Sequence, residues 1–370
     1  MSGVNETTRT VLVACVAALL GVGAMMIYST TSRGDGPLVS PTFIRQMLYV
    51  AFGVGCAFVL GRMDYHRLLG WWKWILAASL LLLVIVLIPG IGRRVNGASR
   101  WLRIGPVGFQ PSEIAKLSLV LFLAAFLGST ARDPRKFKKG VCPALCVTGL
   151  ICALVLVEPD IGTCLLLGAA AAMVLFIAGA RLTHICAPAL AAVPALVFIV
   201  SRGYARDRIE AWIDPWKDPA QTGYHIIQSL IAIGSGGISG VGLGASKQKL
   251  FFLPESQTDF IFAVLAEETG LVGVTLVMLL YAGFVFCGTL IAMRARDAAG
   301  RLLAAGITGI VALQTLINIA VVTKVFPTKG IALPFISAGG SSVVVMLACA
   351  GILYSIARHG NDGPFADPVV

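Results

Sequence analysis

Apolar runs of about the length that crosses a membrane recur along the whole chain. A helix of ~20 apolar residues spans the hydrocarbon core of a bilayer. Such runs lie at residues 10–30, 43–62, 72–90, 112–129, 141–157, 161–180, 184–201, 269–293, 303–326 and 341–357. The pattern predicts an all-α integral membrane protein with about ten transmembrane helices. Residues 1–360 form a single polytopic domain, and the polar tail 361–370 is expected to be disordered.

The links between runs are short, which indicates antiparallel neighbours, except for one interruption at residues 202–268. This segment is rich in Gly, Pro and charge. It is expected to form a long loop between the seventh and eighth spans.

Composition excludes a soluble protein, and the recurrence of apolar runs along the whole chain excludes a soluble protein with a single anchor. The chain is 57% hydrophobic and 13% charged, whereas soluble chains carry about a quarter charged residues. The nine cysteines lie in or beside apolar runs and are expected to be packing residues. The four histidines are scattered without metal-ligand spacing, and no nucleic-acid partner is expected.

Basic residues in short loops orient the protein in the inner membrane. Lys and Arg are enriched on the cytoplasmic side. One short link carries five of them: Arg132, Arg135, Lys136, Lys138 and Lys139. With ten spans, both termini are then cytoplasmic, and segments 91–110 and 202–268 lie outside.

The outer segment 91–110 carries arginines against this rule: Arg93, Arg94, Arg100 and Arg103. One interpretation is an anionic ligand at the outer leaflet, such as a phosphate or pyrophosphate headgroup. The other is contact with anionic membrane lipid. The arginines alone leave both open. Basic residues in 202–268 are no anomaly, because long loops cross regardless of charge.

Charged residues at membrane depth indicate function or internal pairing. Glu113 and Lys116 stand three residues apart on one helical face and are close enough to pair. Glu158 and Asp160 flank Pro159 between two spans, where they could hold a metal, take a proton or cap a helix. Asp160, before Ile-Gly-Thr, has the position of an N-cap.

Asp259 opens an apolar, helical segment at the outer membrane boundary. A carboxylate there has a raised pKa if it is desolvated, and can serve as a base. It could equally be a helix N-cap or a member of an ion pair.

Two glycine-rich stretches, 233–249 and 337–342, could let the backbone approach a phosphate or let helices pack closely. Trp212, Trp216 and Tyr224 fit either an interfacial aromatic belt or a sugar platform.

Four signatures together resemble the shape, elongation, division and sporulation (SEDS) family of peptidoglycan polymerases, which includes FtsW, RodA and SpoVE. They are Val95–Leu102 with Gln110–Lys116, Glu158–Thr163, Gly240–Lys249 leading into Leu253–Phe260, and Pro327–Gly330 with Leu333–Ser342. The likeness runs from the first span to about residue 358. The Ser246–Lys249 and Pro327–Gly330 stretches look most like the FtsW division branch.

The resemblance implies transfer of lipid II disaccharides into glycan strands at the outer leaflet, with release of undecaprenyl pyrophosphate. It also implies that the protein acts in a complex with a class B penicillin-binding protein and other divisome proteins. The family's essential aspartate maps onto Asp259, the expected general base. A divalent cation (Mg²⁺ or Mn²⁺) is expected, with no ligands assigned. The expected substrate-binding residues are Arg100, Trp101, Arg103, Glu113, Lys116, Asp160, Lys247, Lys249, Lys329 and Ser341.

The chain departs from the family pattern at Ala338, Lys324 and Tyr224-His225. Two rival functions remain at this stage. One is a flippase for lipid-linked sugars, which intramembrane charges and broken helices also fit. The other is a non-catalytic scaffold for division proteins.

Overall fold

The computed structural model describes residues 2–31, 39–95, 98–105, 107–130, 132–201, 203–249 and 253–360. The tail 361–370, expected to be disordered, lies outside the described residues.

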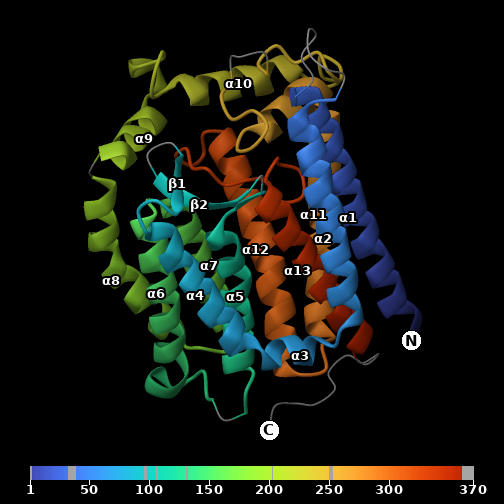
Figure 1. The fold of residues 1–370 in the computed structure, drawn as a ribbon, viewed down its shortest axis with the longest axis vertical. Helices are drawn as coiled ribbons and strands as arrows, with labels where there is room; N and C mark the ends of the chain where they lie inside the picture. The colour runs from blue at the N-terminus through green and yellow to red at the C-terminus, as the bar shows by residue number, and fades with distance from the viewer. Residues whose placement is uncertain are drawn as a thin grey trace.

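A bundle of long helices accounts for every predicted span (Figure 1). Its members are α1 (Ser2–Thr31), α2 (Pro41–Arg62), α4 (Trp72–Leu87), α5 (Pro111–Leu127), α6 (Cys142–Val157), α7 (Ile161–Ile177), α8 (Leu182–Val200), α11 (Ile261–Met293), α12 (Ala298–Val322) and α13 (Gly340–His359). Within the described ranges, six helices are long and apolar enough to cross a membrane, and α4, α7 and most of α8 form shorter apolar helices. The prediction of a multi-pass helical membrane protein is confirmed.

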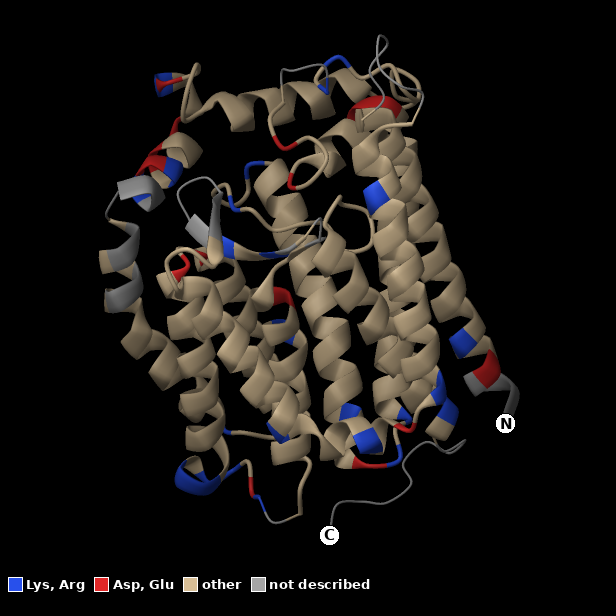
Figure 2. Ribbon diagram, viewed as in Figure 1, with Lys and Arg blue, Asp and Glu red and all other residues tan. Residues whose placement is uncertain are grey.

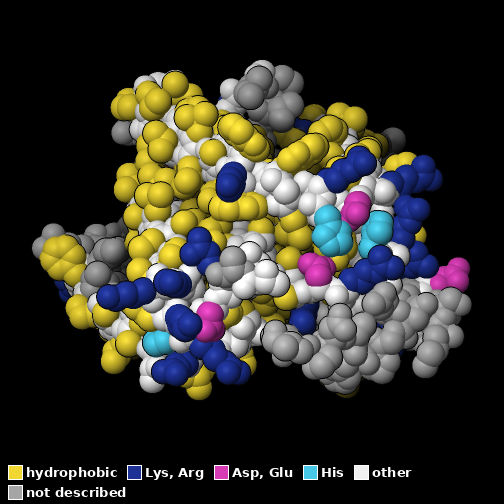
Figure 3. Space-filling model, turned by 90° about the horizontal axis from the view of Figure 1, so that it is seen from below, with side chains coloured by type: hydrophobic (Ala, Val, Ile, Leu, Met, Phe, Trp, Pro, Cys, Tyr) yellow, Lys and Arg dark blue, Asp and Glu magenta, His cyan; other side chains and the backbone are white. Residues whose placement is uncertain are grey.

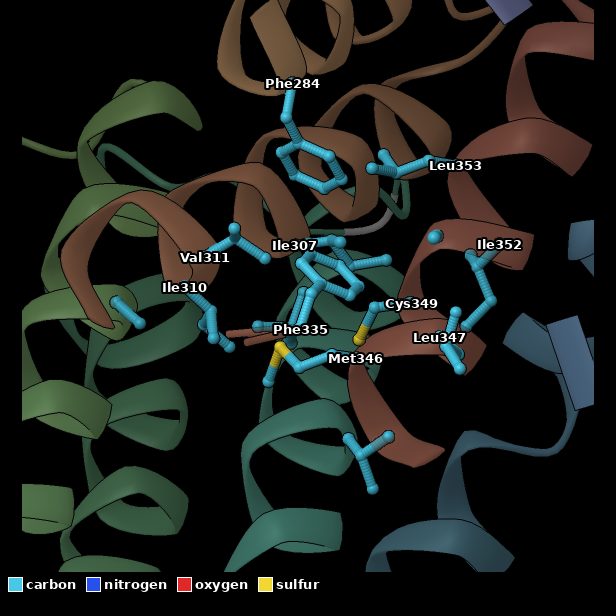
Figure 4. Close-up of a cluster of buried hydrophobic side chains, with 14 of the residues drawn as sticks. Phe284, Ile307, Ile310, Val311, Phe335, Met346, Leu347, Cys349, Ile352 and Leu353 are labelled. Carbon is cyan, nitrogen blue, oxygen red and sulfur yellow. The ribbon is translucent and has the colours of Figure 1, made fainter. Parts of the chain in front are cut away.

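The core lies where α5, α11, α12 and α13 meet. Figure 4 shows apolar side chains from α11, α12 and α13 packed together, including Phe284, Ile310 and Met346. The outer helices instead expose large apolar side chains, such as Phe52 on α2 and Leu190 on α8. This exposure suits helices that face lipid, where apolar surface needs no polar cover. All nine cysteines are free thiols, as expected of packing residues.

α1 begins and α13 ends at the same end of the bundle (Figure 1). The short helix α3 (Tyr65–Gly70) and the basic link that leads into η1 (Phe137–Val141) lie at this end too. Lys and Arg gather there (Figures 2 and 3). This is the end that the basic short links of the sequence predict to be cytoplasmic.

The outer segment 91–110 contains a small sheet that the expectation of an all-α chain missed. Strands β1 (Gly92–Val95), β2 (Ala98–Ile104) and β3 (Val107–Phe109) are antiparallel in the order β1-β2-β3. Leu102 is buried while the adjacent Arg103 is exposed, as alternation along a strand requires. A search for runs of span length does not detect strands this short.

The expected long loop 202–268 is largely helical. It holds α9 (Gly203–Ile213), the 3₁₀ turn η2 (Pro215–Lys217) and α10 (Tyr224–Gly236). The eighth span begins at Ile261 rather than at residue 269, and the backbone breaks at Gly270 (φ 63°, ψ −163°). Only glycine, which lacks a Cβ, adopts this conformation readily.

The eighth span was placed too late because Glu267 and Glu268 look like loop charges. Both are buried and paired inside the protein: Glu268 Oε1 pairs with Lys249 at 2.9 Å, and Glu267 accepts a hydrogen bond from the Ser246 hydroxyl.

The glycines of the stretch 233–249 allow it to pack closely against the backbone of α11. A Cβ on Gly236 or Gly240 would collide with the backbone carbonyls of Ala266 and Glu268. The amides of Val241 and Gly242 donate to the carbonyls of residues 267 and 268. Of the two roles left open for these glycines, the contacts support helix packing.

Candidate functional site at the outer end of the bundle

Asp259 lies in the turn that precedes α11 and is half-buried. The helix begins at Ile261, and its N-cap is Phe260, which makes no side-chain cap hydrogen bond. The interpretation of Asp259 as an N-cap is therefore wrong. Its carboxylate stays available for another role.

The Asp259 carboxylate is closely surrounded. A Cβ added to Gly330 would lie 2.9 Å from Oδ2, so only glycine leaves this space to the carboxylate. Burial, together with the nearby charge of Glu255, raises the pKa of Asp259 to about 7 against the opposing effect of Arg208. A carboxyl with this pKa is ionised in part at neutral pH and is well matched to general-base work.

Three segments far apart in sequence meet beside Asp259. Arg208 on α9 donates from Nη1 to the carbonyl of Thr328 at 3.2 Å. Gly162 in the first turn of α7 lies against the 329–331 segment, since its Cβ would be 3.4 Å from Cβ of Lys329. Burial and the charge of Arg208 lower the pKa of Lys329. Positive groups therefore line this side of the carboxylate.

Asp160 caps α7, as its sequence position indicates. Its Oδ1 accepts from the Thr163 amide at 3.0 Å, and its Oδ2 accepts from the Thr163 hydroxyl at 2.8 Å. Its negative charge still acts on both Asp259 and Lys329. A capping role and an electrostatic role in the site are compatible.

Glu158 is not among the expected substrate-binding residues, but the structure places it beside them. It is 1% exposed, and within the described residues neither carboxylate oxygen has a hydrogen-bond partner. Burial and the nearby Asp160 raise the pKa of Glu158 to about 8. The signal that could have found it is its place beside Asp160 across a proline.

Arg100 and Arg103 differ sharply although both belong to β2. Arg100 is half-buried and donates to the carbonyls of Glu158 at 2.8 Å and Pro159 at 2.6 Å. It also opposes the rise in the pKa of Asp259. Arg103 is exposed, and its Nε donates to the carbonyl of Gly105, two residues away, at 3.0 Å.

Trp101 is half-buried, and its ring edge lies against Gly108 of β3. Ser341, at the start of α13, accepts from the amide of Gln110 at 3.3 Å. The structure thus uses Ser341 to join the start of α13 to the start of α5.

Glu113 and Lys116 form a buried ion pair inside the bundle, with Nζ and Oε2 2.8 Å apart. Lys116 also donates to Oε1 of Gln314 on α12 at 2.9 Å. The structural pairing suggested by their spacing is present.

Lys247 and Lys249 lie elsewhere, between the tops of α1 and α11. Lys249 donates to Ser29 at 2.8 Å and pairs with Glu268, while Lys247 is exposed and its amide donates to Glu267. The hydrogen bonds and ion pairs found in the described segments do not link either lysine to Asp259.

An open, largely apolar cleft of about 610 Å³ has Lys329 in its lining. Helices α7, α8 and α9 and the segment after α12 line it, including Ile161, Leu165, Val197, Phe326 and Lys329. Lys329 belongs both to this cleft and to the surroundings of Asp259. An apolar chain and an anionic headgroup could thus be bound side by side.

The sequence profile of the FtsW/RodA/SpoVE family, described as "Cell cycle protein", matches residues 9–362. The chain belongs to this family. It is 39% identical over 354 residues to "Stage V sporulation protein E" of Bacillus subtilis, covering 95% of this chain and 97% of that protein. It is 40% identical over 358 residues to "Probable peptidoglycan glycosyltransferase FtsW" of Geobacter metallireducens, covering 96% of both.

Solved structures of FtsW/RodA/SpoVE proteins share the fold. One, described as "Structural coordination of polymerization and crosslinking by a peptidoglycan synthase complex", gives a TM-score of 0.76 at 32% identity over 94% of this chain and 96% of the other. The Rod shape determining protein RodA of Thermus thermophilus gives 0.69 at 29% identity over 95% and 97%. The resemblance stated from the sequence motifs is confirmed.

Proposed function

We propose that this chain is a peptidoglycan glycosyltransferase that polymerises lipid II at the outer face of the inner membrane during cell division. The names of the FtsW relatives support the activity. The observation that carries the proposal for this chain is Asp259, a carboxyl with a raised pKa set among basic groups next to an apolar cleft.

In the proposed step, a sugar hydroxyl of one substrate attacks the anomeric carbon of another. The new bond joins that oxygen to the anomeric carbon, the bond from the anomeric carbon to the pyrophosphate oxygen breaks, and the hydroxyl proton passes to Asp259. A positioned base contributes about 10²–10⁴-fold to such a step. The pyrophosphate is an activated leaving group, so no strong general acid is required.

The leaving pyrophosphate needs positive charge rather than a proton. Arg208, Lys329 and Arg100 are the described basic residues whose charges reach the site. Fixed cations aimed at developing negative charge stabilise a transition state strongly in a water-poor pocket. We assign the polyprenyl tail of lipid II to the apolar cleft, with Lys329 beside its headgroup.

A divalent cation fits this site only with help from the substrate. The described residues contain no group of three His, Cys, Asp or Glu side chains placed to hold a metal ion. Mg²⁺, however, is often bound by one or two carboxylates together with substrate phosphates. Glu158, whose two buried oxygens have no hydrogen-bond partner among the described residues, is the carboxylate that would hold it. A bound cation would supply charge neutralisation.

A class B penicillin-binding protein is the proposed partner, and other divisome proteins are proposed to join it. The support is the similarity to the peptidoglycan synthase complex together with the lipid-facing apolar surfaces of the outer helices. Polymerisation of lipid II by the purified protein, alone and with that partner, tests the function. Movement of lipid II across vesicles without glycan synthesis would favour a flippase, and neither activity would favour a scaffold.

The proposed base predicts the pH dependence of polymerisation. Only ionised Asp259 accepts a proton, and its pKa is raised to about 7. The maximal rate should fall as pH is lowered through about 7, and by about tenfold per unit well below it. A rate that stays flat from pH 8 down to pH 5 would contradict the assignment.

The two outer arginines should respond differently to replacement by alanine. Arg100→Ala should weaken lipid II binding by about one to two decades, because a hydrogen bond to a charged group is worth about 1.5–3 kcal/mol. Arg103→Ala, at an exposed position, is the matched control and should change affinity by less than about fivefold. If both variants lose the same affinity for lipid II, or neither loses any, Arg100 does not bind the substrate and its charge is explained by contact with anionic membrane lipid.

The proposed orientation can be checked with cysteine labels at exposed positions. Ala220, between η2 and α10, and Lys138, in η1, are exposed and suit this test. A membrane-impermeant thiol reagent applied from outside should label Ala220→Cys and spare Lys138→Cys, with the unmodified chain measuring background. The reverse pattern would overturn the outer-face assignment.

A further inference from the structure

Asn318 binds the backbone of the residue that carries the proposed base. It lies near the outer end of α12 and is 1% exposed. Its Nδ2 donates to the carbonyl of Asp259 at 2.9 Å and to the carbonyl of Ile331 at 2.7 Å. One amide group therefore joins two segments that are both outside regular helices.

These two segments define the position of the Asp259 carboxylate. Gly330, which lies against Oδ2, directly precedes the Ile331 carbonyl that Asn318 binds. An amide has two N–H donors in a fixed plane. By using both, Asn318 sets the distance between the backbone of Asp259 and the wall that its carboxylate faces.

The neighbouring carbonyls are held from the same part of the chain. The amide of Ala338 donates to the carbonyl of Gln257 at 2.8 Å, and the Ser337 hydroxyl donates to that of Thr258 at 2.6 Å. With Asn318, three consecutive carbonyls before α11 each have a donor from the region 318–338. Among these donors, only Asn318 reaches Asp259 itself.

Gln314, one helical turn before Asn318, binds the segment that the Asp259 carboxylate faces. Its Nε2 donates to the carbonyl of Ala332 at 2.7 Å, and its Oε1 accepts from Lys116. Residues four apart lie on the same helical face. The two amide side chains thus form a clamp on the 331–332 segment.

Asn318 is also left with an unsatisfied acceptor. Its Oδ1 is buried and has no hydrogen-bond partner in the part of the chain that the structure describes. Leaving a buried acceptor unpaired is unfavourable. The side chain is therefore better suited to donating to these two carbonyls than to filling space in the core.

We propose that Asn318 is a positioning residue that holds the Asp259 carboxylate where it accepts the proton of the sugar hydroxyl, through hydrogen bonds to the Asp259 and Ile331 carbonyls. This rests on the proposed role of Asp259 as the base. Small displacements of reacting groups are costly, and about 1 Å of misplacement can lower a rate about a hundredfold.

The test compares Asn318→Leu, which keeps the size and removes both donors, with Thr315→Val on the same helix. Thr315 is buried, its hydroxyl donates to the carbonyl of Val311 in its own helix turn, and its side chain also contacts the Tyr281 hydroxyl rather than the 257–259 or 331–332 carbonyls. Lipid II polymerisation is measured for the full-length protein with its partner, as kcat and KM across pH. Asn318→Leu should lower kcat by about tenfold to a hundredfold with KM nearly unchanged.

The pH profile separates positioning from general loss of packing. Without the clamp the carboxylate becomes better hydrated, so the acid limb of the kcat profile should move to lower pH in Asn318→Leu and stay in place in Thr315→Val. If Asn318→Leu does not accumulate, Asn318→Ser, which retains one donor, takes its place with a smaller loss in the same direction. Equal behaviour of the Thr315 and Asn318 variants, or a change confined to KM, would overturn the inference.

Failure of the proposed function would look different. If Asp259→Asn polymerises normally, Asp259 is not the base and the role assigned to Asn318 falls with it. If Asp259→Asn is inactive but Asn318→Leu matches Thr315→Val, only the positioning role is lost.

Discussion

Replacing Asp259 with asparagine is expected to lower glycan polymerisation by about 10²–10⁴-fold. Asparagine keeps the shape of the side chain but does not accept a proton at neutral pH. The variant should still fold, because the hydrogen bond at this residue uses the backbone carbonyl, which the substitution leaves in place. Polymerisation of lipid II is the measurement, with partner binding and thermal stability recorded on the same preparations.

The structure makes this substitution more informative than the sequence allowed. A helix-capping role for Asp259 is excluded, because the N-cap position of α11 is occupied by Phe260. A metal-binding role also predicts inactivity, but added Mg²⁺ or Mn²⁺ should then restore some activity. Stable, partner-bound Asp259→Asn protein with near-normal synthesis would remove the catalytic assignment.

Glu255→Gln is the matched control for Asp259→Asn. Glu255 is exposed, and its negative charge helps to raise the pKa of Asp259. Its removal should leave an active enzyme whose acid limb is shifted to lower pH, because the base then stays ionised in more acidic solution. Loss of activity as large as in Asp259→Asn would instead place Glu255 in the reaction.

Features set by local sequence could be predicted. The spans follow from the length of apolar runs, because lipid requires every backbone polar group to be satisfied within the helix. The Glu113–Lys116 pair and the Asp160 cap depend on residues three apart, so their spacing alone indicates them. These elements need no knowledge of the tertiary fold.

Features that depend on distant segments could not be predicted. The ion pair of Lys249 with Glu268 joins residues nineteen apart in sequence. Because the sequence does not show that Glu268 is paired, its charge wrongly indicated a loop where α11 has already begun. Asn318 is an ordinary polar residue in an apolar run until the fold brings Asp259 and Ile331 to its amide. Arg208 likewise looked like one of several outer-loop cations before α9 placed its charge beside the carboxylate.

The Glu113–Lys116 pair gives the largest expected effect on stability. Its side chains are 10% and 3% exposed, so removal of one partner strands a charge inside the bundle. Lys116→Met should reduce the free energy of unfolding by about 3–5 kcal/mol. The measurement is unfolding by SDS titration in mixed micelles, with polymerisation assayed in parallel.

The double variant Glu113→Leu with Lys116→Met distinguishes a structural pair from a substrate-binding one. Replacing both members of a buried pair by apolar residues of similar volume is often neutral. Stability should therefore return close to that of the unmodified protein, less about 1 kcal/mol for the lost hydrogen bond from Lys116 to Gln314. Polymerisation should return with it, because the two charges pair with each other inside the bundle and no hydrogen bond or ion pair among the described residues links them to Asp259. A double variant that is stable but inactive would show that these charges act on the substrate, and a stable Lys116→Met would show that the pair contributes nothing to the fold.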